Sequence, residues 1–130
     1  MSNVTVKGGS LEAQISEMLS ASEAVVRAAS KDAAKKAAYD TMKLLKRTSP
    51  KKRGTYAKGW KVTYQDGSYI VHNAKLPGYT QLLEKGHDVI AGGAKVGHAP
   101  AQPHIAPAEK TGADEFVNLA EEYIERRLNQ

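Results

Sequence analysis

The sequence predicts an α+β fold in which a long N-terminal helix and a C-terminal helix pack on a small antiparallel sheet built around a β-hairpin. Three features of the 130 residues support this fold class. Apolar residues recur at helical spacing near both ends, an Asp-Gly pair separates two strand-like segments, and a Gly-rich segment without periodicity follows them. The length suits one domain, so we expect residues 10–130 to form a single unit after a flexible leader, residues 1–9.

The first helix is predicted from Ser10 to about residue 47. Ser10 is a suitable N-cap, and Pro50 prevents continuation of the helix. Unbroken, this helix would be about 55 Å long at 1.5 Å per residue, too long for one small domain to cover. Either it breaks near residues 30–32, or part of it packs on another subunit. Its apolar stripe consists of Ile15, Leu19, Val26, Ala33, Ala37 and Leu45.

A β-hairpin is predicted over residues 60–73, with Asp66-Gly67 as a type I′ turn. Because a two-residue loop fixes the register, Trp60 should pair with Asn73. One side of the hairpin should then cover the first helix, since an isolated hairpin is only marginally stable. That side carries Trp60, Val62, Tyr64, Tyr69 and Val71.

Three further segments complete the prediction. A short helix runs from about Tyr79 to Lys85 and is stopped by Gly86. Residues 87–102 lack helical or strand periodicity, so the sequence predicts a long mobile loop there. A final helix has Pro107 in its first turn and an apolar stripe that continues nearly to the end of the chain.

Composition narrows the function classes. Cysteine is absent, so disulfides and thiolate catalysis are excluded. No apolar run approaches the ~20 residues of a membrane span, and the start lacks the apolar core of a signal peptide. We therefore expect a soluble protein, made in a cytoplasm, with no membrane partner.

Four residues are candidate ligands for a metal site: Glu84, His87, His98 and His104. Their spacing matches none of the compact zinc patterns, and His104 between two prolines is more typical of a packing residue. No serine lies in a strand-to-helix elbow, and the Gly-rich segment is not followed by a phosphate-binding helix start. We expect no catalytic residues and no cofactor. The alternative, a small metal-dependent hydrolase, predicts stoichiometric zinc or manganese that is lost on His98→Ala.

A basic segment spans residues 43–61, with no acid between Asp40 and Asp66. Concentrated positive charge of this kind attracts nucleic acid through phosphate neutralisation. A solvated loop, or one that docks on an acidic neighbour, is the alternative, and Trp60 is already assigned to the core. The basic residues are Lys43, Lys46, Arg47, Lys51, Lys52, Arg53, Lys58 and Lys61.

The order of these segments resembles the head-tail joining and tail-completion family of long-tailed bacteriophages and prophages. The resemblance extends from about residue 10 to the end. Its specific parts are two blocks, "YTQLLEKGH" at residues 79–87 and "AQPHIAPAEK" at residues 101–110. Proteins of this kind include tail terminators and neck proteins, which are small α+β subunits that form rings, commonly hexamers, where DNA passes from capsid to tail.

The resemblance implies a non-enzymatic structural protein of the virion neck, made in the bacterial host cytoplasm. It implies three kinds of partner: further copies of itself, neighbouring neck or connector and tail-tube proteins, and passing DNA without sequence specificity. Lys46, Arg47, Lys51, Lys52, Arg53, Lys58 and Lys61 would then line the DNA channel or dock a partner. Contacts within or between rings would involve Tyr79, Leu82, Leu83, Glu84, Lys95, His98, Pro103, His104 and Ile105.

Overall fold

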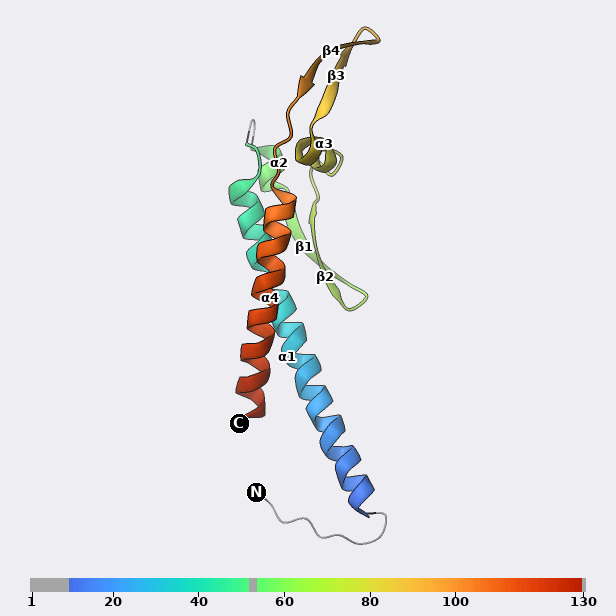
Figure 1. Ribbon diagram of the computed structural model, residues 1–130, viewed down its shortest axis with the longest axis vertical. Coiled ribbons are helices and arrows are strands. Elements are labelled where there is room, and N and C mark those ends of the chain that lie inside the picture. The colour runs from blue at the N-terminus through green and yellow to red at the C-terminus, as the bar shows by residue number, and fades with distance from the viewer. Residues whose placement is uncertain (1–9, 52–53, 130) are drawn as a thin grey trace.

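The computed structural model describes residues 10–51 and 54–129 as an elongated α+β molecule (Figure 1). The predicted fold class is confirmed. Helix α1 (Ser10–Thr48) and helix α4 (Ile105–Leu128) lie side by side, and two separate two-stranded antiparallel ribbons accompany them. The expected leader, residues 1–9, and two predicted basic residues, Lys52 and Arg53, lie outside the described residues.

Helix α1 is continuous over 39 residues, so the break considered near residues 30–32 does not occur. At 1.5 Å per residue it is about 58 Å long. Helix α4 covers part of that length, from Gly112 beside Thr41 to Arg127, whose guanidinium pairs with Asp32. A Cβ built on Gly112 would collide with the Thr41 hydroxyl, so the close approach of the two helices favours glycine there. Within the described residues, no helix has the length and apolar character needed to cross a membrane.

The first ribbon joins β1 (Trp60–Gln65) and β2 (Ser68–Asn73) in the predicted register, with Trp60 opposite Asn73. Asp66 and Gly67 have φ values of 51° and 82°, as the type I′ turn requires. Trp60 is 3% exposed beneath the ribbon, whereas Tyr64 is 49% exposed. The aromatic side therefore packs closely on α1 near Trp60 and loosens towards the turn.

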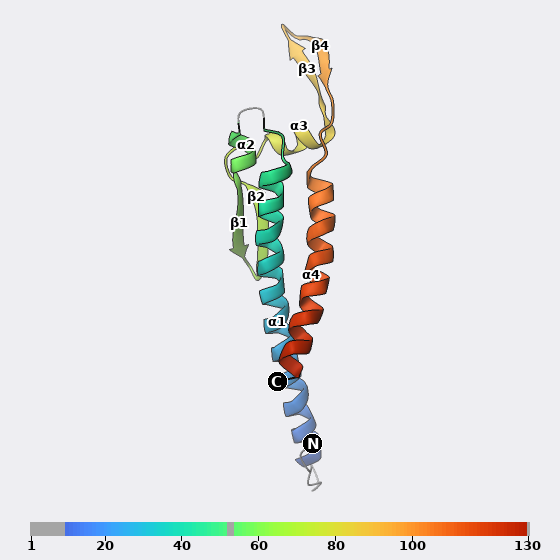
Figure 2. The ribbon, with the colours of Figure 1, turned by 90° about the vertical axis from the view of Figure 1, so that its left-hand side faces the viewer.

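The second ribbon corrects one prediction. Residues 87–102 were expected to be a long loop, but they contain β3 (His87–Ala91) and β4 (Ala94–Ala99), paired antiparallel around Gly92-Gly93. The prediction failed because most of both strands is exposed, so no apolar/polar alternation marks them. The ribbon projects beyond the helices (Figures 1 and 2) and exposes Val89, Ile90 and Val96.

Two short helices connect these parts. Helix α2 (Thr55–Lys58) precedes β1, and α3 (Tyr79–Lys85) has the predicted bounds. Gly86 ends α3 with φ 77°, and a Cβ there would lie 2.7 Å from the Ala99 carbonyl oxygen. The buried core is small and lies where α1, α2, β1 and the start of α4 meet. It contains Leu45, Tyr56, Trp60 and Ala108.

Candidate functional site

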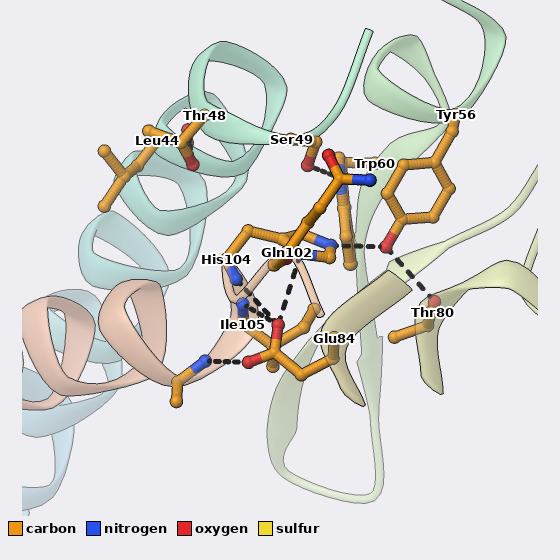
Figure 3. A network of polar contacts seen from close by, with 11 residues as sticks. Leu44, Thr48, Ser49, Tyr56, Trp60, Thr80, Glu84, Gln102, His104 and Ile105 are labelled. Carbon is orange, nitrogen blue, oxygen red and sulfur yellow. Dashed lines mark hydrogen bonds and ion pairs between the residues drawn. The ribbon is translucent and has the colours of Figure 1, made fainter. Parts of the chain in front are cut away.

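A polar junction joins α3 to the first turn of α4 (Figure 3). The Glu84 carboxylate accepts hydrogen bonds from three consecutive backbone N–H groups, those of His104 at 2.7 Å, Ile105 at 2.8 Å and Ala106 at 3.1 Å. These donors at the helix start have no partner within the helix, and α4 has no side-chain cap from its own N-cap residue. Glu84 therefore caps α4 from a distant part of the chain.

The electrostatics of this junction favour an ionised Glu84. Partial burial of the carboxylate by itself would raise its pKa. The hydrogen bonds from the three backbone N–H groups outweigh that effect, and the pKa of Glu84 lies below its ordinary value of 4.5. The positive end of the α4 dipole favours the same ionised form.

The His104 ring is enclosed at the centre of the junction, with a side chain 1% exposed. Its Nδ1 lies 2.8 Å from the Gln102 carbonyl oxygen, which can only accept, so Nδ1 carries the proton. Nε2 then accepts a hydrogen bond from the Tyr56 hydroxyl at 2.7 Å. Burial, followed by the nearby Glu84 charge, raises the pKa of Tyr56 and favours its protonated, donating form. His104 is thus a satisfied packing residue.

Further contacts attach the junction to the residue after α1 and to β2. The Trp60 indole donates from Nε1 to the Ser49 hydroxyl at 2.8 Å, and the Tyr56 and Trp60 rings meet edge to face at 5.6 Å. Asn73 donates to the Tyr56 carbonyl oxygen at 2.7 Å. These buried polar groups are hydrogen-bonded to one another, so the junction is suited to holding elements together.

The four residues considered for a metal site do not converge. Glu84 and His104 belong to the junction, while His98 lies on the projecting ribbon, where its Nδ1 is 2.9 Å from Asp88 Oδ1. His87 has a buried Nδ1 without a hydrogen-bond partner in the described part of the chain. No cluster of three or more potential metal ligands occurs among residues 10–51 and 54–129.

The residues predicted to make ring contacts fall into two groups. Leu83, Glu84 and Ile105 are half-buried and His104 is buried, so their side chains engage their own chain. The exposed group comprises Tyr79, Leu82, Lys95, His98 and Pro103. The junction residues Ser49, Tyr56 and Asn73 were not predicted, and a buried polar residue gives no sequence signal that distinguishes it from a surface one.

The described basic side chains of the segment are exposed, and they lie on α1, α2, β1 and the turn after α1. No carboxylate in the described residues forms an ion pair with any of these side chains. Lys51 donates to the Arg47 carbonyl oxygen, which keeps its ammonium close to the end of α1. The exposed basic residues are Lys43, Lys46, Arg47, Lys51, Lys58 and Lys61.

The opposite end of α1 is uncovered. Helix α4 ends near Asp32, and the N-terminal part of α1 projects beyond it (Figure 1). We call residues 12–28 the α1 spur. Its large apolar side chains are exposed: Ile15 by 47%, Met18 by 65%, Leu19 by 64% and Val26 by 39%.

Comparison with known proteins identifies the family. Residues 9–86, more than half of the chain, match the family model described as "Bacteriophage HK97-gp10, putative tail-component". The match covers α1, both strands of the first ribbon and α3, including Glu84. No curated protein and no solved structure gives a match. The chain belongs to the HK97-gp10-like family of bacteriophage tail components.

Proposed function

We propose that this protein is a non-enzymatic virion component that assembles as a ring at the head-tail junction and completes or terminates the tail. The family match supports the part of this proposal that makes the protein a bacteriophage tail component. The ring, its position in the neck and the number of copies, six by analogy with similar proteins, belong to the proposal.

The main support for a ring is the exposed apolar surface at both ends of the elongated chain. The α1 spur and the β3–β4 ribbon each project from the helical body (Figures 1 and 2). Each also exposes several large apolar side chains. Patches of this kind mark interaction surfaces. An apolar patch that projects from one end of the chain suits a heterologous contact with a different surface of the next copy, which forms a ring when its rotation closes.

The junction supports a structural role. Glu84 and His104, the two titratable groups at its centre, are occupied with α4 backbone groups, the Gln102 carbonyl and Tyr56. A pair that holds secondary structure in this way is poorly placed to exchange protons with a substrate. The proposal therefore assigns the two sequence blocks to fold and assembly.

Size-exclusion chromatography with light scattering, followed by negative-stain imaging at high protein concentration, tests the ring. We expect closed rings, and we expect the purified chain to restore tail completion in phage extracts that lack it. A chain that remains monomeric at all concentrations and restores no infectivity would refute the proposal. As a control, Lys110→Ala should assemble normally, because this lysine makes an exposed i,i+4 ion pair with Asp114.

Passing DNA is a further proposed partner, and sequence-independent nucleic-acid binding is the second candidate function. The exposed basic residues, which pair with no carboxylate of the described residues, favour it, and six copies at +5 each carry about +30. Filter binding of duplex DNA should then weaken steeply with salt, and Lys46→Glu with Arg47→Glu should weaken it further. If the dilute monomer binds DNA tightly and never forms rings, this second function replaces the first.

A further inference from the structure

The two ends of α1 carry opposite charge. The α1 spur contains three glutamates, Glu12, Glu17 and Glu23, against one arginine, Arg27. The other end of the helix and the turn after it carry the basic segment, whose described members form no ion pair with a described carboxylate. The molecule is therefore a long rod with an acidic apolar helix at one end and a basic region at the other.

The spur has the form of a helix that binds in a groove. Ile15, Met18 and Leu19 lie three and four residues apart, and Val26 follows Leu19 by seven, so these side chains share one face. Ser22 lies on that face too, because it lines a shallow depression together with Leu19 and Val26. The segment is about 25 Å long at 1.5 Å per residue.

A matching cleft lies at the basic end. It has a volume of about 680 Å³ and lies between residues 50–51 and 54–56 on one side and α3 on the other. Its walls are mainly apolar and include Pro50, Tyr56, Leu76, Tyr79 and Leu83, with Lys51 also in the lining. Tyr79, a large aromatic residue of this lining, is 52% exposed. A helix with apolar and acidic side chains is complementary to this lining.

A spur cannot reach the cleft of its own chain. The spur is the N-terminal end of α1, which is continuous and about 58 Å long, whereas the cleft lies beyond the other end of α1, beside α3. Figure 1 shows α2 and α3 at the end of α1 farthest from the spur. A spur docked in the cleft must therefore come from another molecule, and a second copy of this chain supplies a helix of suitable charge and apolar pattern.

We propose that the α1 spur of one copy docks in the cleft of the next copy, with Glu12 and Glu23, the glutamates that flank the apolar face of the spur, towards Lys51 and the other described basic residues of that end. The inference rests on the proposed ring and names the two surfaces that form it. Each copy then offers one spur and one cleft, so a closed ring leaves neither surface exposed.

Cysteine cross-linking tests this contact directly, because the natural chain has no cysteine. Ser22→Cys places a thiol on the apolar face of the spur, and Thr55→Cys places one at the cleft. Both residues are exposed and neither is one of the large apolar groups, so both variants should fold and assemble. When the two variants are mixed with a short bismaleimide, we expect a covalent dimer that contains one copy of each.

Ser20→Cys is the matched control. This serine is also exposed on the spur, but it lies two residues from Ser22 and about 200° around the helix axis, on the other face. Its cross-linking yield with Thr55→Cys should be at least about fivefold lower. Glu12→Lys with Glu23→Lys should also lower the Ser22→Cys yield, and adding Lys51→Glu to the Thr55→Cys chain should restore it.

The other outcomes separate the two proposals. If rings form but Ser22→Cys and Thr55→Cys do not cross-link, the docking inference is wrong and the ring stands. If Ser22→Cys alone gives efficient dimers, spurs pair with spurs, and the docking inference is again wrong. A chain that stays monomeric under every condition removes both the ring and the docking contact.

Discussion

Removal of the Glu84 carboxylate should destabilise the protein more than any change to an exposed ion pair. Three backbone N–H groups at the start of α4 lose their acceptor in Glu84→Ala. A lost helix cap costs about 0.5–2 kcal/mol, and a hydrogen bond to a charged group contributes about 1.5–3 kcal/mol. Because water can replace part of this contact at a side chain that is 16% exposed, we expect a total loss of about 2–4 kcal/mol.

Glu84→Gln separates the charge from the hydrogen bonds. The amide oxygen can still accept from His104 and Ile105, as Oε1 does now, but the charge that complements the helix dipole is lost. We expect a loss of about 1–2 kcal/mol, which is smaller than that of Glu84→Ala. Glu122→Gln is the control, because Glu122 makes an exposed i,i+4 pair with Arg126 and should cost no more than about 0.5 kcal/mol.

Urea unfolding followed by circular dichroism at one fixed protein concentration measures these differences. The pH dependence gives a second readout. The folded pKa of Glu84 lies below its ordinary value of 4.5, so its stabilisation is complete above pH 4.5 and is lost as the pH falls through the folded pKa. The gap between the natural chain and Glu84→Gln should therefore shrink in acid. A Glu84→Ala variant within 0.5 kcal/mol of the natural chain would refute the capping role.

Three further changes test other parts of the structure. Ser49→Ala should cost about 1–3 kcal/mol in urea unfolding, because the buried Trp60 indole N–H loses its acceptor; an unchanged midpoint would contradict this. Gly86→Ala should cost about 2 kcal/mol or more, because φ is 77° and the new Cβ would lie 2.7 Å from backbone, and an unshifted melting temperature would count against it. Burial raises the pKa of Glu115 to about 7, together with a hydrogen bond and the charge from Asp40. Between pH 4.5 and 7 the Glu115 carboxyl group is therefore protonated in the folded protein and ionised in the unfolded protein. Stability from this group falls as the pH rises through that window, and Glu115→Gln should reduce the fall by on the order of 1 kcal/mol; an identical pH profile would refute it.

Local chemistry determined the parts of the fold that the sequence predicts well. The Asp66-Gly67 turn sets the register of its hairpin over six residues on either side, so β1 and β2 follow from the sequence. Helices α1 and α4 follow from apolar spacing, and α3 follows from the stop at Gly86. The family resemblance depends on segment order and short blocks, which are also sequence properties, and the family match confirms it.

The candidate site depended on contacts between distant residues. Glu84 meets backbone groups 20 to 22 residues further along the chain, and Tyr56 meets His104 across 48 residues. No local pattern encodes such pairs, because the partners are brought together by the packing of α1, α3 and α4. The β3–β4 ribbon escaped prediction for a related reason, since exposed strands carry no burial pattern, although Gly92-Gly93 is a hairpin-turn signal.

The sequence by itself determined that an amphipathic helix too long for a small domain begins this chain, and that a basic segment follows it. The tertiary structure decided which part of the helix stays uncovered, because α4 ends beside Asp32 and leaves the α1 spur in solvent. It also decided that the cleft lies at the end of α1 opposite the spur. The physical reason is that periodicity specifies which face of a helix is apolar, whereas the length and position of its partner determine where that face is buried.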